Sequence, residues 1–405
     1  MGSSYKINIL TIAFLFCSAF LEYKTLTWPI YVYATSAFIF GSFVMSFNRC
    51  REVKVYYIVV IVIILTNVIS SMLNRGQSPL STLYASNILI DWFFFYVVAF
   101  VSPNKEELDN FVQRVIKIVL VAYYVQLAVY PIAIWGTSSS EWIKEDIVTY
   151  RAIVVGCQHA ISLGIFYYFA KYLNTKSKIS LVMFILCLST LIIRSFRMMS
   201  LAAVVSLLFL YLTYYSKKRN GFSPFRMVGI FIIVYIVGNV LYMTVPIIHD
   251  NISMMIERFS SENMNIYDED YIRTITIGYY YTEFFQSPWE MFFGSGLPST
   301  VGQYGTYVRD TLISEYKYNY VDWGLIGLSW FTGIPLILSI IYAMVKAIKA
   351  RVNSKLLFVG AWFVHTLIIS ITDPEAYQHH AFLVESIVLY MVYLQDPNFL
   401  KLRRK

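Results

Sequence analysis

The stretch VYYIVVIVIILTNVISSML, residues 55–73, decides the class of this protein. It contains no charged residue, and basic residues stand at both of its ends, Lys54 before it and Arg75 after it. A bilayer core of about 30 Å needs roughly 20 apolar residues in a helix. The stretch therefore predicts a transmembrane helix.

The composition of the whole chain agrees with this prediction. The 405 residues are 58% hydrophobic and only 14% charged, and the mean hydropathy is +0.59. A soluble chain of this size could not cover its surface with so few charges, since soluble domains are nearer a quarter charged. The composition excludes a cytosolic enzyme, a secreted scaffold, a disordered protein and a nucleic-acid-binding module. Three of the four cysteines lie in apolar runs, which argues against a disulfide framework or a zinc site.

The same length rule predicts twelve spans along the chain. Long apolar runs without a period of two favour helices over a β-barrel, so we predict an all-α integral membrane protein of one polytopic domain, residues 1–405. The first span ends at Glu22 without a small-residue cleavage site, and we expect it to be a retained helix. The spans lie near residues 7–22, 28–47, 55–73, 82–101, 112–134, 152–171, 179–194, 197–215, 227–247, 323–345, 356–372 and 379–395.

The distribution of lysine and arginine predicts the orientation. If the carboxyl terminus lies in the cytoplasm, 22 of the 32 basic residues fall in inner loops or at the termini. We therefore expect both termini in the cytoplasm, and the net charge of +8 requires no nucleic acid. The ten basic residues left outside are Lys24, Arg75, Lys144, Arg151, Arg194, Arg197, Arg258, Arg273, Arg309 and Lys317.

One outer loop, residues 248–322 between the ninth and tenth spans, is much longer than the others. At about 75 residues it is of a length that is usually functional or disordered. Aromatic residues recur throughout it, which favours order, and residues 268–285 are predicted to form a helix with acids in its first turn. We expect this loop to form part of an active site.

Five outer arginines are candidates for binding an anion. Arg194 and Arg197 stand in the short turn IIRSFRMMS between the seventh and eighth spans, where the alternative is a side chain that snorkels to lipid headgroups. Arg258, Arg273 and Arg309 belong to the long loop, where the alternative is a local salt bridge with neighbouring acids. The planar guanidinium binds phosphate bidentately, so these residues suit a diphosphate whose lipid tail lies in the bilayer.

Ionisable residues also occur inside the predicted spans, at Asp91, His159, His365 and Glu385. Such groups face the interior of a helix bundle and mark pathways, as in proton-coupled transporters, or they hold helices together. Arg151 and His159 are two turns apart and are predicted to line one face of the sixth helix.

The last outer loop, TDPEAYQHH at residues 372–380, is a short polar cluster. It holds Asp373, Glu375, His379 and His380, but their spacing matches no strong metal motif. The chain has no Walker loop, serine nucleophile elbow or dinucleotide fingerprint, and no inner loop is long enough for a nucleotide-driven catalytic domain.

Four features together carry a resemblance to a known family. They are the minimal outer turn from Arg194 to Arg197, the late position of the large outer loop, the segment DEDYIRTITIGYYYTEFFQSPWEMFFGSGLPS (268–299), and YNYVDWGLIGLSWFTGIPLIL (318–338). In this order they resemble the O-antigen polymerase and O-antigen ligase family (Wzy and WaaL types). The resemblance covers about residues 180–345.

The resemblance implies a glycosyltransferase at the outer face of a bacterial inner membrane, working without nucleotide or metal cofactor. Its donor and acceptor would be oligosaccharides linked to undecaprenyl diphosphate, and a chain-length regulator protein is an expected partner. Arg194 or Arg197, together with Arg273, would neutralise the diphosphate. Ligases carry a histidine shortly before the glycine-leucine segment, where this chain has acids instead, which favours the polymerase. Of these acids, Glu315 or Asp310 is the candidate to orient the acceptor hydroxyl.

Five further candidates are assigned to substrate binding. These are Arg258, Arg309, Arg151, His159 and Tyr280, the last because tyrosine stacks on sugar rings, although tyrosine also belongs to membrane-interface belts.

Three other functions compete with the polymerase: an O-antigen ligase, a twelve-helix secondary transporter or flippase, and a peptidoglycan polymerase of the shape, elongation and division group. Against the transporter, the link between the sixth and seventh spans is only YLNTKSK, and glycine- or proline-broken helices are scarce. The peptidoglycan polymerases usually have ten spans and a catalytic aspartate in an outer loop.

Overall fold

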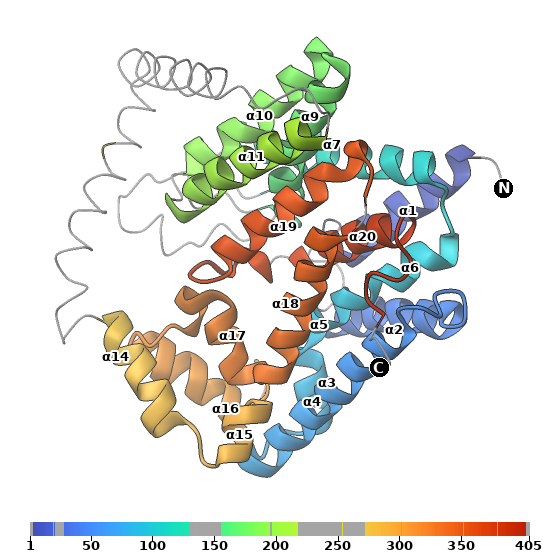
Figure 1. Cartoon of the computed structure of the whole chain (residues 1–405). Helices are drawn as coiled ribbons and strands as arrows, with labels where there is room; N and C mark the ends of the chain where they lie inside the picture. Colours follow the sequence, from blue (N-terminus) through green and yellow to red (C-terminus); the bar gives the residue numbers. More distant parts are fainter. Residues whose placement is uncertain are drawn as a thin grey trace.

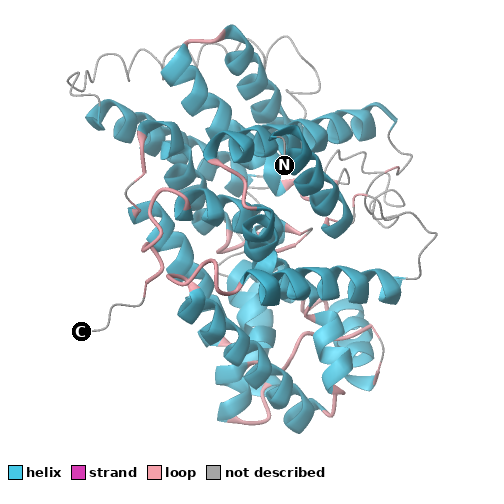
Figure 2. Cartoon of the chain, turned by 90° about the vertical axis from the view of Figure 1, so that its right-hand side faces the viewer, coloured by secondary structure: helices cyan, strands magenta, loops and turns pink. Residues whose placement is uncertain are grey.

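The computed structural model describes residues 3–18, 20, 28–129, 134, 155–194, 197–217, 253, 272–300, 302–350, 352–378 and 380–401. Throughout these ranges the regular structure is helical, mostly α with short 3-10 and π segments, and they contain no strand (Figure 2). The predicted all-α class is confirmed for this part of the chain.

Figure 1 shows the arrangement of the α-helices in the described part of the chain. Their bounds are α1 Ser3–Cys17, α2 Trp28–Ser46, α3 Lys54–Arg75, α4 Pro79–Ala85, α5 Asn87–Ile90, α6 Phe94–Val101, α7 Lys105–Val129, α9 His159–Thr175, α10 Lys178–Arg194, α11 Arg197–Lys217, α14 Ile272–Tyr279, α15 Pro288–Phe293, α16 Gln303–Thr306, α17 Gly324–Thr332, α18 Ile334–Lys349, α19 Leu357–Ile369 and α20 Ala381–Tyr393. The 3-10 segments are η1 Asp91–Phe93, η5 Tyr320–Trp323, η6 Ser354–Leu356 and η7 Pro374–Ala376, and the π-helical segments are η3 Tyr280–Phe284 and η4 Tyr307–Glu315.

Three described helices are long and apolar enough to cross a membrane: α3, α7 and the stretch Met198–Ser216 of α11. The bent pair Pro79–Ala85 and Asn87–Val101, with an angle of 63°, makes a fourth if it counts as one span. Other predicted spans coincide with apolar helices of 10–17 residues, and the ninth, 227–247, lies outside the described residues. The structure thus supports a membrane protein, whereas the count of twelve is not confirmed.

The tenth predicted span is broken in the middle. α17 ends at Thr332, Gly333 adopts φ +88°, and α18 begins at Ile334 with Pro335 in its first turn. A break of this kind leaves carbonyl groups without partners inside the helix. Segments from elsewhere in the chain supply those partners, so the break is part of the fold.

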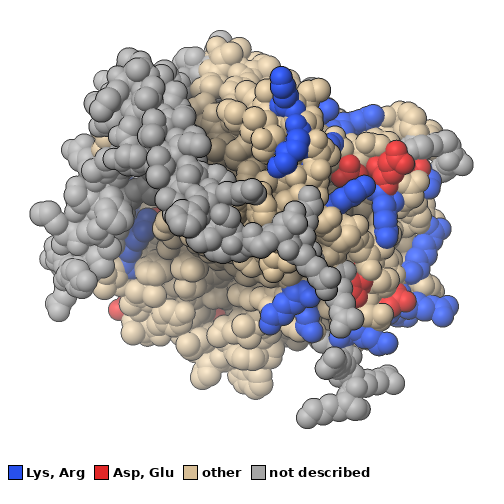
Figure 3. Space-filling view, turned by 45° about the horizontal axis from the view of Figure 1, so that its top comes forward, with Lys and Arg blue, Asp and Glu red and all other residues tan. Residues whose placement is uncertain are grey.

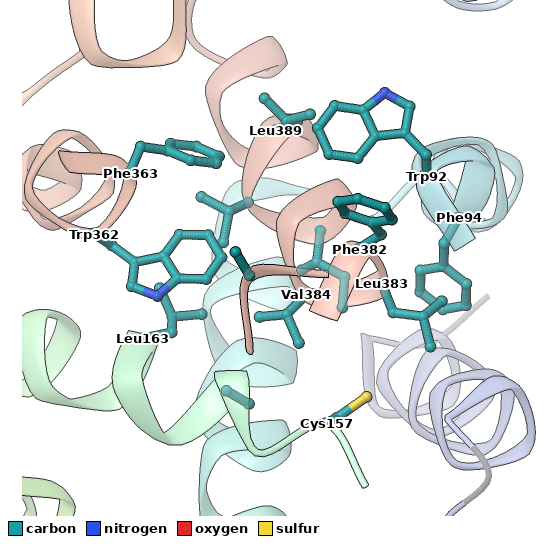
Figure 4. Close-up of a cluster of buried hydrophobic side chains, with 14 of the residues drawn as sticks. Trp92, Phe94, Cys157, Leu163, Trp362, Phe363, Phe382, Leu383, Val384 and Leu389 are labelled. Atoms are coloured by element: carbon teal, nitrogen blue, oxygen red, sulfur yellow. The ribbon is translucent and has the colours of Figure 1, made fainter. Parts of the chain in front are cut away.

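A cluster of large apolar side chains joins α6, α9, α19 and α20 (Figure 4). Trp92 and Phe382 meet edge to face with ring centroids 5.3 Å apart, and Trp362 of α19 lies across the cluster from them. These side chains are almost fully buried. The cluster therefore fixes the ends of α9 and α20, from which the polar residues described below project.

Segments predicted to be inner loops meet at one end of the helices. Lys6 donates to the carbonyl of Ser102 at 3.0 Å, and Arg49 donates to the hydroxyl of the same serine at 3.2 Å. Lys171 donates to Gln113 at 3.0 Å. In the view of Figure 3, lysine and arginine side chains gather on the right-hand side of the molecule.

Candidate functional site

Arg194 and Glu375 form a buried ion pair at the opposite end of these helices. Arg194 is the last residue of α10, and Glu375 lies in η7. Nη1 donates to Oε1 at 3.2 Å and Nη2 donates to Oε2 at 2.7 Å, while the side chains are only 6% and 4% exposed. Two parallel bonds of this kind fix both the position and the plane of the guanidinium. Arg194 therefore points into the protein and contacts the last outer loop.

The local sequence of that loop explains the position of Glu375. Pro374 stands at the start of η7, where its fixed φ suits a helical turn, and the Asp373 carboxylate accepts from the Glu375 N–H at 2.9 Å. Gln158, which precedes α9, donates to Oε2 of Glu375 at 3.4 Å. Asp373 and Tyr123 of α7 also interact electrostatically with Arg194. The pair thus joins α7, α9, α10 and the loop before α20.

A second acid–base pair lies on the same loop. His380, which caps α20, has its Nδ1 2.7 Å from Oδ2 of Asp91 in η1, and both side chains are largely buried. The thiol of Cys157 donates to the His380 carbonyl at 3.5 Å. Cys157 and Gln158 are neighbours in sequence, so a single turn contacts both His380 and Glu375. This contact with Asp91 fixes the orientation of the His380 imidazole.

A third pair is buried below this turn. His159 Nε2 lies 3.7 Å from Oε1 of Glu385, and Ser162 and Thr366 lie 3.4 Å and 3.3 Å from the two ring nitrogens. The Glu385 oxygens accept no hydrogen bond from the described residues. Two of the four ionisable residues predicted within spans are thus brought together, and His365, also fully buried, packs against the ring of Phe166.

The candidates in the long loop lie in different surroundings. Arg309 and Asp310 pair with each other at 2.7 Å, and both side chains are more than half exposed. Their hydrogen bond raises the pKa of Arg309 and lowers that of Asp310. Glu315 is exposed as well. Among the described contacts, none joins these three residues to Arg194.

Arg273 and Tyr280 belong to the inner surface of the loop. Burial raises the pKa of Asp322, and the charge of Arg273 lowers it in part, which places the two residues within electrostatic range. The Tyr280 ring stacks on Trp330, with centroids 4.1 Å apart and planes 12° apart. Because Tyr280 is fully buried, the structure gives it a packing role within the loop.

Four predicted residues are not described. Arg151, Arg258 and His379 lie outside the described residues, and Arg197 begins α11 without a described side chain. Within the described ranges, no group of three or more histidine, cysteine, aspartate and glutamate residues has the geometry to hold a metal ion.

Arg194 was a predicted site residue, but its pairing with Glu375 was not expected, because the two residues lie 181 positions apart in the sequence. A second buried pair, between Arg75 of α3 and Glu290 of α15, was not expected either. The visible signals were Arg75 at the end of an apolar run and the Ser-Pro at 287–288 before Glu290, which marks a helix start.

Comparison with known proteins adds no assignment. No protein-family model matches the chain, and no curated protein matches it significantly in sequence.

Proposed function

We propose that the chain is a membrane glycosyltransferase that polymerises oligosaccharide repeat units linked to a polyprenyl diphosphate. The observation that carries the proposal is the Arg194–Glu375 pair, an ion pair held at the ends of apolar helices with a histidine–aspartate pair on the same loop. Ionisable groups in such a place are expensive and point to function by default. A buried ion pair is also weak as a source of stability, since apolar replacements are often neutral.

The chemistry assigns a role to each group. In the reaction, the acceptor oxygen bonds to the anomeric carbon of the donor, the bond from that carbon to the diphosphate breaks, and the acceptor hydroxyl loses its proton. Arg194 would balance the charge that develops on the diphosphate, with Glu375 holding the guanidinium in place beforehand. His380, oriented by Asp91, would take the proton in place of Glu315 or Asp310.

The proposal includes the membrane arrangement expected from the sequence: twelve spans, both termini in the cytoplasm and a large outer loop that contributes to the site. The contacts of Lys6, Arg49 and Lys171 support it, because these residues of predicted inner loops lie at one end of the helices. Arg194 and Glu375 lie at the other ends of α10 and α19, which suits a site on the outer face. The ligase remains the alternative within the same chemistry.

A secondary transporter or flippase is a second candidate, favoured by two observations. The break at Gly333 and the 63° bend after α4 are discontinuous helices of the kind that transporters use, and they were not expected. The buried His159–Glu385 pair would suit a proton-coupled carrier.

One experiment separates these functions: deletion of the gene in the host bacterium, followed by electrophoresis of its surface polysaccharide. Loss of a polymerase leaves a single attached repeat unit, loss of a ligase or of a flippase for the repeat unit leaves no attached repeat, and loss of an unrelated transporter leaves the ladder unchanged. An unchanged ladder would overturn the proposal.

Variants returned to the deletion strain test the residues. Arg194→Ala is expected to abolish polymer, and the double variant Arg194→Met/Glu375→Leu, which removes both charges together, separates lost activity from lost stability. Arg273→Lys keeps the charge but loses the planar fork, so chains of normal length would contradict a bidentate role for Arg273. Arg114→Ala, which removes an arginine of a predicted inner loop that donates to Asn8, serves as the control and is expected to leave the ladder intact.

A further inference from the structure

Residues 284–297, which follow α14 and η3, run along α3 from its carboxyl-terminal end toward its middle and then back to that end. The segment begins at the end of α3, where Arg75 donates to the Phe284 carbonyl and pairs with Glu290. The Phe293 carbonyl then accepts from Asn67 at 2.7 Å, eight residues earlier in α3. By Leu297 the chain is back beyond the helix end, where its carbonyl accepts from Gln77 at 2.9 Å.

The depth of this excursion follows from helix geometry. A helix rises 1.5 Å per residue, so Asn67 lies about 12 Å along the α3 axis from Arg75. α3 has 22 residues and the hydropathy of a membrane span. Its length of about 33 Å matches a hydrocarbon core of about 30 Å. If α3 crosses the bilayer, the turn at residues 293–296 lies well below the outer surface.

Non-helical backbone is tolerated at such a depth only when its polar groups find partners within the protein. Here they do. The Gly294 carbonyl accepts from Ser70 at 2.7 Å, and the N–H groups of Ser295 and Gly296 donate to the Trp330 and Phe331 carbonyls at 3.1 and 2.8 Å. Those two carbonyls belong to the last turn of α17. The turn at residues 293–296 therefore supplies hydrogen-bond donors to the carbonyls that the break after α17 leaves without helical partners.

α3 presents two different stripes. Asn67, Ser70, Ser71 and Asn74 follow helical spacing and face the segment, with the Asn74 side chain accepting from Ser287 at 3.0 Å. Leu65, Ile69 and Leu73, also at helical spacing, are 51%, 51% and 73% exposed. An exposed apolar stripe on a membrane span faces lipid acyl chains.

α15 packs against α3 and carries two exposed aromatic side chains of its own. Its Glu290 is fully buried against Arg75, whereas Trp289 and Phe292 are 70% and 48% exposed. Neither side chain carries a polar group that reaches water as a tyrosine hydroxyl does, apart from the indole N–H, and neighbouring exposed apolar side chains of this kind mark a contact surface. Because α15 packs against α3, the lipid that surrounds a membrane-spanning α3 is the occupant that this surface would meet.

We propose that residues 287–299 form a re-entrant segment in the outer half of the bilayer, where α15 presents Trp289 and Phe292 to lipid acyl chains. This inference requires α3 to cross the membrane and is independent of any transferase activity. It moves part of the predicted outer loop 248–322 into the membrane.

Fluorescence quenching tests the lipid contact directly. The purified full-length chain is reconstituted into phosphatidylethanolamine and phosphatidylglycerol vesicles, with or without brominated acyl chains. The emission of Trp289 is the difference between the wild type and Trp289→Phe. Brominated lipid is expected to quench this emission, whereas aqueous iodide is not. The matched control is Trp330→Phe, which removes a tryptophan that is 1% exposed and whose emission neither quencher should reach. Quenching of the Trp289 component by iodide and not by brominated lipid would overturn the proposal.

Thiol labelling provides a second readout that does not depend on Trp289. Phe292→Cys and Tyr316→Cys replace side chains of nearly equal exposure, 48% and 47%, and the four native cysteines are buried. Tyr316 stands between Glu315 and Lys317, both exposed, so its thiol is expected to react with a membrane-impermeant maleimide in the reconstituted protein. The Phe292→Cys thiol is expected to react only after denaturation in sodium dodecyl sulfate. Equal labelling of the two variants in the bilayer would contradict a lipid-covered α15.

Discussion

The two buried arginine–glutamate pairs have the same chemistry and different surroundings. Arg75 lies between the rings of Phe284 and Tyr304, 4.3 and 5.4 Å from their centroids, and its partner Glu290 also accepts from the N–H of Gln286 at 2.6 Å. All these partners belong to the loop segment that the pair ties to α3. The pair acts as a structural clamp within one region.

Arg194 and Glu375 instead lie among side chains from several other helices and loops. The side chains around this pair are polar: the amide of Gln158, the carboxylate of Asp373 and the phenol of Tyr123. A ligand with negative charge could compete with Glu375 for the guanidinium, whereas the Arg75 guanidinium is enclosed by aromatic rings. The comparison teaches that burial of an ion pair does not by itself identify a site; what surrounds the pair does.

The largest effect is expected when the clamp loses one member. Arg75→Ala leaves the fully buried Glu290 without its counter-charge, which should cost about 3–5 kcal/mol in the free energy of unfolding. Thermal unfolding of the protein in detergent measures the loss. Arg309→Ala, at an exposed pair, should leave the unfolding midpoint unchanged. If Arg75→Ala unfolded at the same temperature as the wild type, the Arg75–Glu290 pair would not stabilise the fold.

Apolar double replacements separate the two pairs more sharply. Arg75→Met/Glu290→Leu and Arg194→Met/Glu375→Leu both remove the charges together, so both should fold. Elongation of a lipid-linked repeat by the reconstituted protein should then fall by about 10²–10³-fold only in the second variant, as expected for lost electrostatic stabilisation. Equal activity in the two double variants would remove the functional distinction between the pairs.

Much of the fold followed from composition and periodicity, because apolar helices need only a local pattern. α3 coincides closely with the predicted span 55–73, and Arg194 stands in the predicted turn. The break at Gly333 was missed because the run from 323 to 345 is apolar throughout, and hydropathy does not register a glycine with positive φ.

The partners of the site residues were not predictable in the same way. Glu375 meets Arg194, and Glu290 meets Arg75, only because the helices pack in a particular order, and a single sequence carries no signal of that order. The acids nearest in sequence to the loop arginines were the natural candidates. Of these, Asp310 is paired with its own neighbour at the surface.

A smaller effect is expected at Gly294, where the segment 287–299 packs closely against the break between α17 and α18. Gly294 adopts φ +84° and ψ 158°, and an added Cβ would overlap the Gly333 nitrogen and the Phe331 oxygen. Gly294→Ala should therefore destabilise the fold by at least about 1–3 kcal/mol. Gly278→Ala is the control, because that glycine lies in α14 with open space around it, and alanine there should stabilise the helix by about 0.5–1 kcal/mol. Similar midpoints for both variants would contradict the close packing at Gly294.

The smallest effect is expected at Asp322 and Arg273, which lie within electrostatic range of each other. Burial raises the pKa of Asp322, and the charge of Arg273 offsets the rise only in part. A carboxyl with a raised pKa binds its proton more tightly in the folded state than in the unfolded chain. Its contribution to stability is therefore complete below the unfolded pKa of about 3.9 and is lost as pH rises through the folded pKa. Asp322→Asn removes that loss, so its unfolding midpoint should exceed that of the wild type at pH 7 and approach it at pH 4. Arg273→Gln should deepen the loss at pH 7. If instead Asp322→Asn lowered the midpoint at pH 7, Arg273 would dominate over burial, and this pair would join Arg194–Glu375 as a charged pair.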